Sequence, residues 1–223
     1  MRISPLQVGA AFWELCAVGL PPGYLLPMHT LYSLSKVLAG VLLAVLLGCP
    51  LGLALGASRG IQMALMPLID FIRPIPPLAW ILLAIIWFGI GFGSAVFLIF
   101  LGAFFPIVLG TCSGVRGVDP LLVDAVRTLG GNRRDIWLKV LLPGAMPSLL
   151  TGIKVGTGIG WMTLVAAEFT GVRQGYGLGY MIMSARDLQR LDAVVAGMVG
   201  IGMVGLALEW MLGRIYRWLL RWQ

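Results

Sequence analysis

Residues that could carry out covalent chemistry are few in this chain, and they stand apart from one another. His29 is the only histidine, and Cys16, Cys49 and Cys112 lie singly in apolar runs. Metal sites and disulfide frameworks need paired or clustered ligands, and enzymatic sites need a nucleophile or acid with a partner nearby. The cysteines are therefore expected to be buried packing residues and His29 a surface residue in a loop. We expect neither a metal site nor a catalytic site.

Ionisable residues in apolar surroundings could instead act on a solute through charge alone. Arg73 could attract an anion, and Glu168 lies deep in a later apolar run. Ionisable groups in such runs usually face a helix-bundle interior or an aqueous path. A structural alternative for Arg73 is neutralisation by Asp70, three residues earlier and one helical turn away. For Glu168 the alternatives are a gate contact near the outer face and an ordinary structural pair.

The segment RPIPP at residues 73–77 interrupts the same apolar run with three prolines. Proline lacks a backbone donor and should bend or unwind a helix here, and irregular backbone inside a membrane is tolerated only where protein shields it or it lines a cavity. Trp80, Trp87 and Trp161 could line a pathway, although aromatic residues in spans more often pack or anchor at interfaces. The candidate residues for a translocation pathway are Arg73, Pro76, Pro77, Trp80, Trp161 and Glu168.

The composition shows what kind of element must position these residues. Of the 223 residues, 59% are hydrophobic and only 11% are charged, and the mean hydropathy is +0.96. These values lie far outside those of a soluble globular domain. Because a membrane span takes about 20 residues plus a connection, the chain has room for five or six spans. We expect an all-α, polytopic membrane protein.

Five apolar runs are long enough to be spans. They are residues 31–58, 61–87, 94–112, 147–171 and 193–210. Residues 1–28 contain a further apolar stretch that resembles the hydrophobic region of a signal peptide but lacks a small-x-small cleavage site followed by a soluble protein. We interpret residues 1–28 as a short span or an interfacial helix and residues 29–223 as one transmembrane domain.

Lysine and arginine predict the orientation, because positive charge in short loops tends to remain in the cytoplasm. With six spans and the amino terminus inside, the cytoplasmic set is Arg2, Arg59, Arg116, Arg127, Arg133, Arg134, Lys139, Arg214, Arg217 and Arg221. The opposite side receives Lys36, Arg173, Arg186 and Arg190. The basic residues are spread over separate loops and form no stripe, so we expect no binding of nucleic acid.

A polar island at residues 119–143 separates the third and fourth runs. An Asp-Pro pair opens it as a helix start would, residues 123–129 can form a short amphipathic helix, and the Gly-Gly pair at 130–131 allows a sharp turn. A second short helix over 133–141 is expected to stop before Pro143. Two short helices around a glycine turn would form a rigid projection for a partner's groove; the alternative is an ordinary loop with one helical turn.

Glycines recur at four-residue intervals in two of the apolar runs. They are Gly48, Gly52 and Gly56 in the first run and Gly152, Gly156 and Gly160 in the fourth. Each series places a smooth groove on one helix face, where another helix can approach closely. We expect tight helix packing, with participation in a dimer interface as the alternative.

The spacing within the polar island resembles a known signature. Asp124, Ala125, Gly130, Val140, Leu142 and Pro143 fit E-A-A-x(3)-G-x(9)-I-x-L-P, the cytoplasmic signature of permease subunits in bacterial ABC importers. From Leu31 to about Arg186 the chain also resembles the nitrate, sulfonate, taurine and bicarbonate branch of these permeases. This resemblance runs through SLSKVLAG, PLGLALGASRG, LIDFIRPIPPLAWILLAIIWFGIGFGS, FLIFLGAFFPIVLGTCSGVRGVDP and WMTLVAAEF. An aspartate at 124 and a valine at 126 replace the usual glutamate and alanine.

The resemblance implies a type I ABC importer-like transmembrane domain with a cytoplasmic coupling helix, in the cytoplasmic (inner) membrane of a bacterium or archaeon. It implies a dimer of permeases, expected to be a homodimer, two cytoplasmic ATPase subunits and an external substrate-binding protein. The ATPase-coupling residues that it implies are Asp124, Ala125, Arg127, Thr128, Leu129, Gly130, Arg133, Leu142 and Pro143. Because the chain has no G-x-x-x-x-G-K-[ST] loop, we expect ATP and Mg on the partner subunits and no catalysis by this chain.

A different class of function is a secondary transporter or channel that works alone. Such transporters are often built from duplicated inverted halves, and the sequence contains no such duplication. The identity of the solute stays open, because in this architecture the external binding protein does most of the selecting. Nitrate, an organosulfonate such as taurine, bicarbonate and a vitamin precursor are all compatible with the resemblance.

Overall fold

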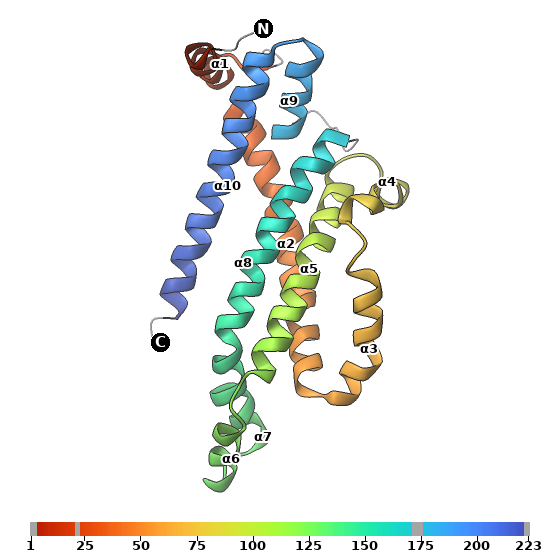
Figure 1. Cartoon of the computed structure of the whole chain (residues 1–223), viewed down its shortest axis with the longest axis vertical. Coiled ribbons are helices and arrows are strands. Elements are labelled where there is room, and N and C mark those ends of the chain that lie inside the picture. The colour runs from red at the N-terminus through yellow and green to blue at the C-terminus, as the bar shows by residue number, and fades with distance from the viewer. Residues whose placement is uncertain (1–3, 21–22, 171–175, 221–223) are drawn as a thin grey trace.

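The computed structural model describes residues 4–20, 23–170 and 176–220, and the described residues form helices without any strand. The long helices are α2 (Leu26–Ala57), α5 (Phe92–Arg116), α8 (Leu142–Thr170) and α10 (Leu191–Leu219). The shorter ones are α1 (Pro5–Ala17), α3 (Arg59–Ile72), the 3-10 turn η1 (Pro77–Trp80), α4 (Ile81–Phe88), α6 (Pro120–Thr128), α7 (Arg133–Asp135), the π-helical turn η2 (Ile136–Leu141) and α9 (Leu178–Asp187). Figure 1 shows an elongated bundle with α6 and α7 at one end and α1 and α9 at the other.

Helix α5 lies against both α2 and α8, and glycines bring these helices together (Figure 1). A Cβ atom added at Gly52 of α2 would lie 2.6 Å from the carbonyl oxygen of Val108 in α5. One added at Gly156 of α8 would lie 2.8 Å from the carbonyl oxygen of Ala103, also in α5. Tight helix packing is therefore confirmed as the use of both glycine series. These faces are filled within the chain and are not free for a second subunit.

The span count agrees with the expected five. Four helices are long and apolar enough to cross a membrane, and the pair formed by α3 and η1–α4 brings the number to five if it is counted as one broken span. The two parts of this pair meet at an angle of 83°. The break falls between Ile72 and Pro77, so the prediction that the RPIPP segment bends or unwinds a helix is confirmed.

Helix α1 does not supply a sixth span. Its 13 residues would extend about 20 Å at 1.5 Å per residue, less than the roughly 30 Å of a hydrocarbon core. In Figure 1 it is viewed end-on at the α9 end of the molecule. The start of the described chain therefore lies opposite α6, and the six-span arrangement with both at the same face is wrong. Arg2, on which that arrangement drew, lies outside the described residues.

An ion-pair network fixes α1 to the start of α10. Arg190 donates to both carboxylate oxygens of Glu14, at 2.6 and 2.7 Å, and to Asp192 at 2.9 Å. The Arg190 guanidinium holds the pKa of the Glu14 carboxyl below its usual value, chiefly through this hydrogen bond. A lowered pKa means that the pair keeps its stabilising effect until the pH falls through that value. The bidentate geometry also fixes the direction of α1.

The glycine packing predicts different outcomes for one substitution at two nearby positions of α8. Gly156→Leu would push a side chain into the α5 backbone, whereas a Cβ atom at Gly158 meets no atom within 4 Å. We expect Gly156→Leu to destabilise the bundle by about 1–3 kcal/mol or more and Gly158→Leu to be tolerated. Thermal unfolding in detergent measures the difference, and equal melting temperatures for the two variants would contradict this packing.

Candidate functional site: a helical projection and an arginine-lined cavity

Helices α6 and α7 form a projection beyond the end of the bundle (Figure 1). Asp119 begins α6 by accepting a hydrogen bond from the backbone N–H of Leu121 at 2.9 Å, and Pro120 follows at the first helical position. Asn132 begins α7 in the same way, accepting from the N–H groups of Arg134 and Asp135. Each helix start is thus satisfied by its own sequence. The first of the two predicted short helices is confirmed, and the second begins where it was predicted.

Gly130 makes the turn between these helices. Its φ is +79°, a left-handed conformation that costs a residue with a Cβ atom about 1–2 kcal/mol. Its N–H donates to Arg127, and the N–H of Gly131 donates to Val126 at 2.9 Å. This pair of bonds is the Schellman motif, which satisfies the last carbonyl groups of a helix. The expected special backbone at Gly130 is confirmed.

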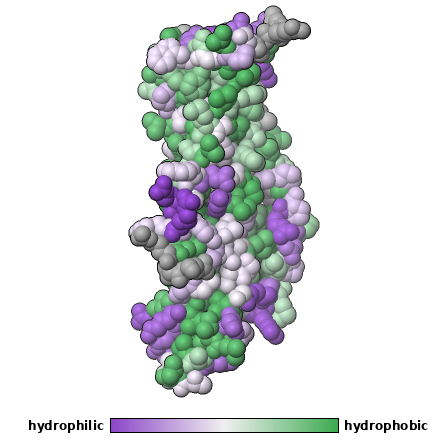
Figure 2. Space-filling model, turned by 60° about the vertical axis from the view of Figure 1, so that its left-hand side comes forward, coloured by the Kyte–Doolittle hydropathy of each residue, from purple (hydrophilic) through white to green (hydrophobic). Residues whose placement is uncertain are grey.

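The projection exposes apolar and charged side chains together. Leu121 is 73% exposed and Leu129 is 87% exposed. Arg127 donates to Asp124 across one turn at 3.1 Å, with both side chains more than 60% exposed. Figure 2 shows hydrophobic side chains bordered by hydrophilic ones at this lower end of the molecule. The projection is thus amphipathic, with exposed leucines next to exposed charged groups.

The sequence prediction was wrong about the end of the second short helix. It does not stop before Pro143: residues 133–169 form one helical stretch, in which α7 leads through the π-helical turn η2 into α8. In an α-helix the ring of Pro143 would press on the carbonyl of the residue four positions earlier. The N–H of Leu142 instead reaches back five residues to Trp137, and this wider turn accommodates the proline. Leu142 and Pro143 thus belong to the first turn of α8, while the other expected coupling residues lie in the projection.

Three of the predicted pathway residues share one cavity. Arg73, Pro77 and Trp80 line a cavity of about 250 Å³, together with Gly102 and Phe105 of α5. The other described lining residues are apolar, so the guanidinium is the charged group of this cavity. Pro76 lies beside it and is exposed.

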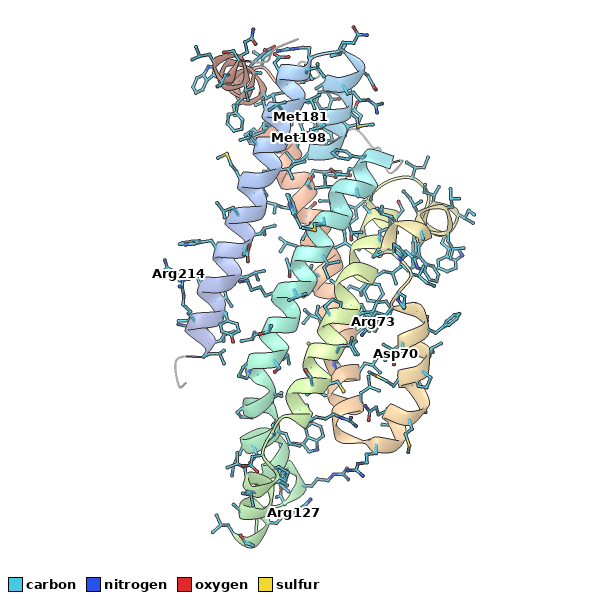
Figure 3. The ribbon with its side chains drawn as sticks, viewed as in Figure 1. Asp70, Arg73, Arg127, Met181, Met198 and Arg214 are labelled. Carbon is cyan, nitrogen blue, oxygen red and sulfur yellow. The ribbon has the colours of Figure 1, made fainter. Side chains whose placement is uncertain are left out.

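The expected neutralisation of Arg73 by Asp70 is wrong. Both residues are described and exposed, and no ion pair within 4 Å joins them (Figure 3). Arg73 follows the last residue of α3, at the point where the chain bends, and its side chain lines the cavity against α5. Asp70 lies within the preceding turn and does not line it. The backbone is still helical at Arg73, whose N–H donates to the carbonyl of Ile69 at 2.9 Å. The pair is therefore absent because the Arg73 side chain lines the cavity, and not because the helix is broken between the two residues.

The other two pathway candidates lie elsewhere. Trp161 lines a groove of about 840 Å³ between α8 and α10. Glu168 is buried at the α9 end of α8 and is bonded to Lys36, with 2.7 Å between Nζ and Oε1. The structure therefore does not bring the six candidates into one site. Of the two alternatives for Glu168, a gate contact and a structural ion pair, the structure shows the ion pair.

Sequence reasoning missed the residues around Glu168. Lys36 was counted only as a positive charge on the outer side, but within α2 it is 1% exposed. His29, expected at the surface, is also within α2 and fully buried. A lysine inside an apolar run is itself the signal of a buried partner, and it could have identified Lys36. Cys112 is buried as expected, while Cys16 and Cys49 are only half-buried.

No group of three or more histidine, cysteine, aspartate or glutamate side chains able to hold a metal ion occurs among the described residues. Several of the described charged groups form ion pairs, others lie on the exposed surface of the projection, and Arg73 lines the α3–α5 cavity. Such an arrangement can bind partners and attract an anion.

Comparison with known proteins agrees with this arrangement. Residues 35–222 match the family described as binding-protein-dependent transport system inner membrane component. A putative ABC transporter permease of Methanocaldococcus jannaschii is 41% identical over 94% of this chain and 86% of its own length. The taurine transport system permease of Escherichia coli is 38% identical over 94% and 76%. The bicarbonate transport system permease of Synechococcus elongatus is 33% identical over 86% and 69%.

The fold also agrees with that of a solved transporter. An inward-facing structure of the MetNI methionine ABC transporter superposes with a TM-score of 0.72 at 19% identity, covering 84% of this chain and 93% of that one. This match shows a shared transmembrane fold. On the sequence matches, this chain belongs to the binding-protein-dependent transport system inner membrane components, as an ABC importer permease of the sulfonate, taurine and bicarbonate type.

Proposed function

We propose that this chain is the subunit through which an ATP-driven importer moves a small anion across the cytoplasmic membrane of a bacterium or archaeon, by alternating access. Two copies would form the path, two ATPase subunits would bind the α6–α7 projections, and an external binding protein would deliver the solute. ATP and Mg would bind to the ATPase subunits, and this chain would carry out no covalent step.

The exposed apolar surface of the projection is the observation that carries the proposal. Leu121 and Leu129 are exposed on the projection beyond the apolar bundle. The projection is also rich in basic residues, which include Arg127, Arg133 and Arg134. By the positive-inside rule this end faces the cytoplasm, where leucines exposed to water need a partner. A transporter or channel that works alone has no use for such a surface, so the structure adds nothing in favour of that alternative.

The arginine-lined cavity supports an anionic solute. An apolar wall leaves fewer water molecules to compete with an anion for the guanidinium. The guanidinium can donate two parallel hydrogen bonds to a sulfonate or carboxylate group. Taurine, aliphatic sulfonates and bicarbonate are named for similar permeases, and each carries an oxyanion group. Arg73, Pro77 and Trp80, which line this cavity, are therefore proposed to line the path.

Binding of the ATPase tests the proposal directly. Leu129→Asp should abolish copurification of the ATPase subunit encoded with this chain, because it places a charge in the centre of the proposed contact. Leu188→Asp is the matched control, since Leu188 is an exposed leucine at the opposite end. Equal loss with both variants, or with neither, would remove the projection as the ATPase-binding surface.

The glycine turn makes a second prediction about coupling. Gly130→Val should lower ATP hydrolysis stimulated by the loaded binding protein about tenfold, because a β-branched residue is strained at this φ by about 1–2 kcal/mol. Asparagine tolerates the left-handed region, so Gly130→Asn should keep most of the activity. No atom lies within 4 Å of an added Cβ, so a steric clash cannot explain the contrast. Full stimulation in the valine variant would show that the turn does not transmit the signal.

The cavity makes a prediction about the solute. Arg73→Gln should lower uptake by proteoliposomes about tenfold for whichever of taurine, methanesulfonate and bicarbonate the importer accepts, and Arg73→Lys should keep part of it because the charge remains. Asp70→Asn should leave uptake unchanged, because Asp70 does not pair with Arg73. If Asp70→Asn reduces uptake as strongly as Arg73→Gln and the double variant recovers it, the arginine serves an ion pair and not the anion.

A further inference from the structure

Three consecutive backbone N–H groups at the start of α9 are bound by side chains from other helices. Gly177 donates to Nδ1 of His29 at 3.0 Å, Leu178 to Oγ of Ser33 at 3.0 Å, and Gly179 to Oε2 of Glu168 at 2.8 Å. His29 and Ser33 belong to α2, and Glu168 belongs to α8. The first N–H groups of a helix have no partner within it. Here α2 and α8 together supply the partners that water or a local cap would otherwise provide.

Glu168 is the centre of this contact. One carboxylate oxygen accepts from Lys36 at 2.7 Å and the other from Gly179, and the Ser33 hydroxyl lies 3.2 and 3.3 Å from the two. Glu168 and Lys36 are each 1% exposed. A buried charge pair is tolerated only when its remaining hydrogen-bonding sites are satisfied, and this one has partners on both oxygens. The Lys36 ammonium also lies over the Tyr32 ring, 4.7 Å from its centroid.

Glycine permits the close approach of α9 to this carboxylate. Gly177 has φ +149°, and a Cβ atom there would overlap the Glu168 carboxylate group. A Cβ atom at Gly179 would lie 2.5 Å from the Cβ of Glu168. Any residue with a side chain would clash with Glu168 at either position, so the position of α9 depends on Gly177 and Gly179 as much as on the carboxylate.

The contact joins two parts of the molecule. Helix α9 packs on α10 through Ile182 and Met181, which face Gly197, and Figure 3 shows Met181 and Met198 at this end. The 840 Å³ groove lies between α8 and α10, on the α6 side of this contact. There, α8 and α10 are joined by the ion pair between Lys154 and Glu209, with side chains 42% and 66% exposed. The two contacts thus differ: the one between Glu168 and α9 is buried, and the ion pair between α8 and α10 is open to solvent.

We propose that Glu168, held by Lys36, is a positioning residue that anchors the α9–α10 pair to α2 and α8, so that α10 can move during transport only at its α6 end. The anchor acts through the N–H of Gly179 and not through contact with the solute. This inference rests on the proposed transport function and adds to it the fixed point of the moving helix.

Two double variants separate the anchor from simple charge pairing. Lys36→Met with Glu168→Gln removes both charges and keeps an acceptor for Gly179, whereas Lys36→Met with Glu168→Leu removes the charges and the acceptor. Neither leaves an unpaired buried charge, the change that most damages a fold. If Glu168 only balances Lys36, the two variants should behave alike.

The first readout is how well a cysteine on α9 is protected from reaction with a maleimide. Ala185 lies on α9 and is 1% exposed, so Ala185→Cys, in a protein whose native cysteines are alanine, reports detachment of α9 through its reaction with a maleimide. We expect protection in the glutamine double variant. In the leucine double variant we expect labelling at least about tenfold faster, consistent with loss of a buried hydrogen bond to a charged group. Lys154→Met with Glu209→Gln is the control and should leave Ala185→Cys protected.

The second readout is ATP hydrolysis stimulated by the loaded binding protein, measured on the assembled importer. It should stay within about threefold of the unaltered protein in the glutamine variant and fall at least about tenfold in the leucine variant. Equal labelling, or equal stimulation, in the two double variants would overturn the proposal. A failure of the proposed function would instead show as absent stimulation in the unaltered protein, and the labelling does not depend on it.

A variant that leaves every charge in place covers the case in which a double variant does not assemble. Gly179→Ala brings a methyl group against the Glu168 side chain and should displace α9, with faster labelling of Ala185→Cys and reduced stimulation. Unaltered labelling and stimulation in Gly179→Ala would also overturn the anchor.

Discussion

The close packing of α2 and α8 on α5 is the contact on which the rest of the structure depends. Van der Waals packing and small residues, not exclusion of water, hold helices together in a membrane, and here glycines let backbones meet almost directly at Gly52 and Gly156. This three-helix unit fixes both ends of α8. One end carries the α6–α7 projection through η2, and the other carries Glu168. A displacement of the projection is therefore passed to a rigid rod, because α7, η2 and α8 form one helical stretch.

The π-helical turn gives this rod its one irregular point. It lies between the projection and the apolar part of α8, where Pro143 could not fit a regular α-helix. Wider turns of this kind often mark functional sites in helices. The signature proline at 143 thus does not end a helix, as proline commonly does, but sets the geometry at which the projection joins the span. This explains why a coupling signature extends to Leu142 and Pro143, several residues beyond the exposed surface.

The parts of this structure that could be predicted from the sequence are those that depend on local chemistry. Hydropathy located the five spans, the RPIPP segment located the break, and the Gly-Gly pair located the turn at Gly130. The parts that could not be predicted depend on packing between distant segments. Lys36 and Glu168 are separated by 132 residues, and the sequence around either residue does not predict the other as its partner. The prediction of an Asp70–Arg73 pair failed for the same reason, because the Arg73 side chain lines a cavity against the distant helix α5 and does not pair along its own helix.

The contrast between the buried contact of α9 with Glu168 and the exposed Lys154–Glu209 pair links stability to movement. Moving α9 and α10 away from α8 would leave the Lys36–Glu168 pair intact but would break the bond from the Gly179 N–H to the buried Glu168 carboxylate, and leaving a buried charged group without such a partner costs about 1–3 kcal/mol or more. An exposed pair such as Lys154–Glu209 contributes at most about 1 kcal/mol, because water replaces each partner. Any change in the angle between these helices therefore concentrates at the α6 end. That end is also where the projection would receive force from an ATPase, so the helix separation that is least costly is the one nearest the source of energy.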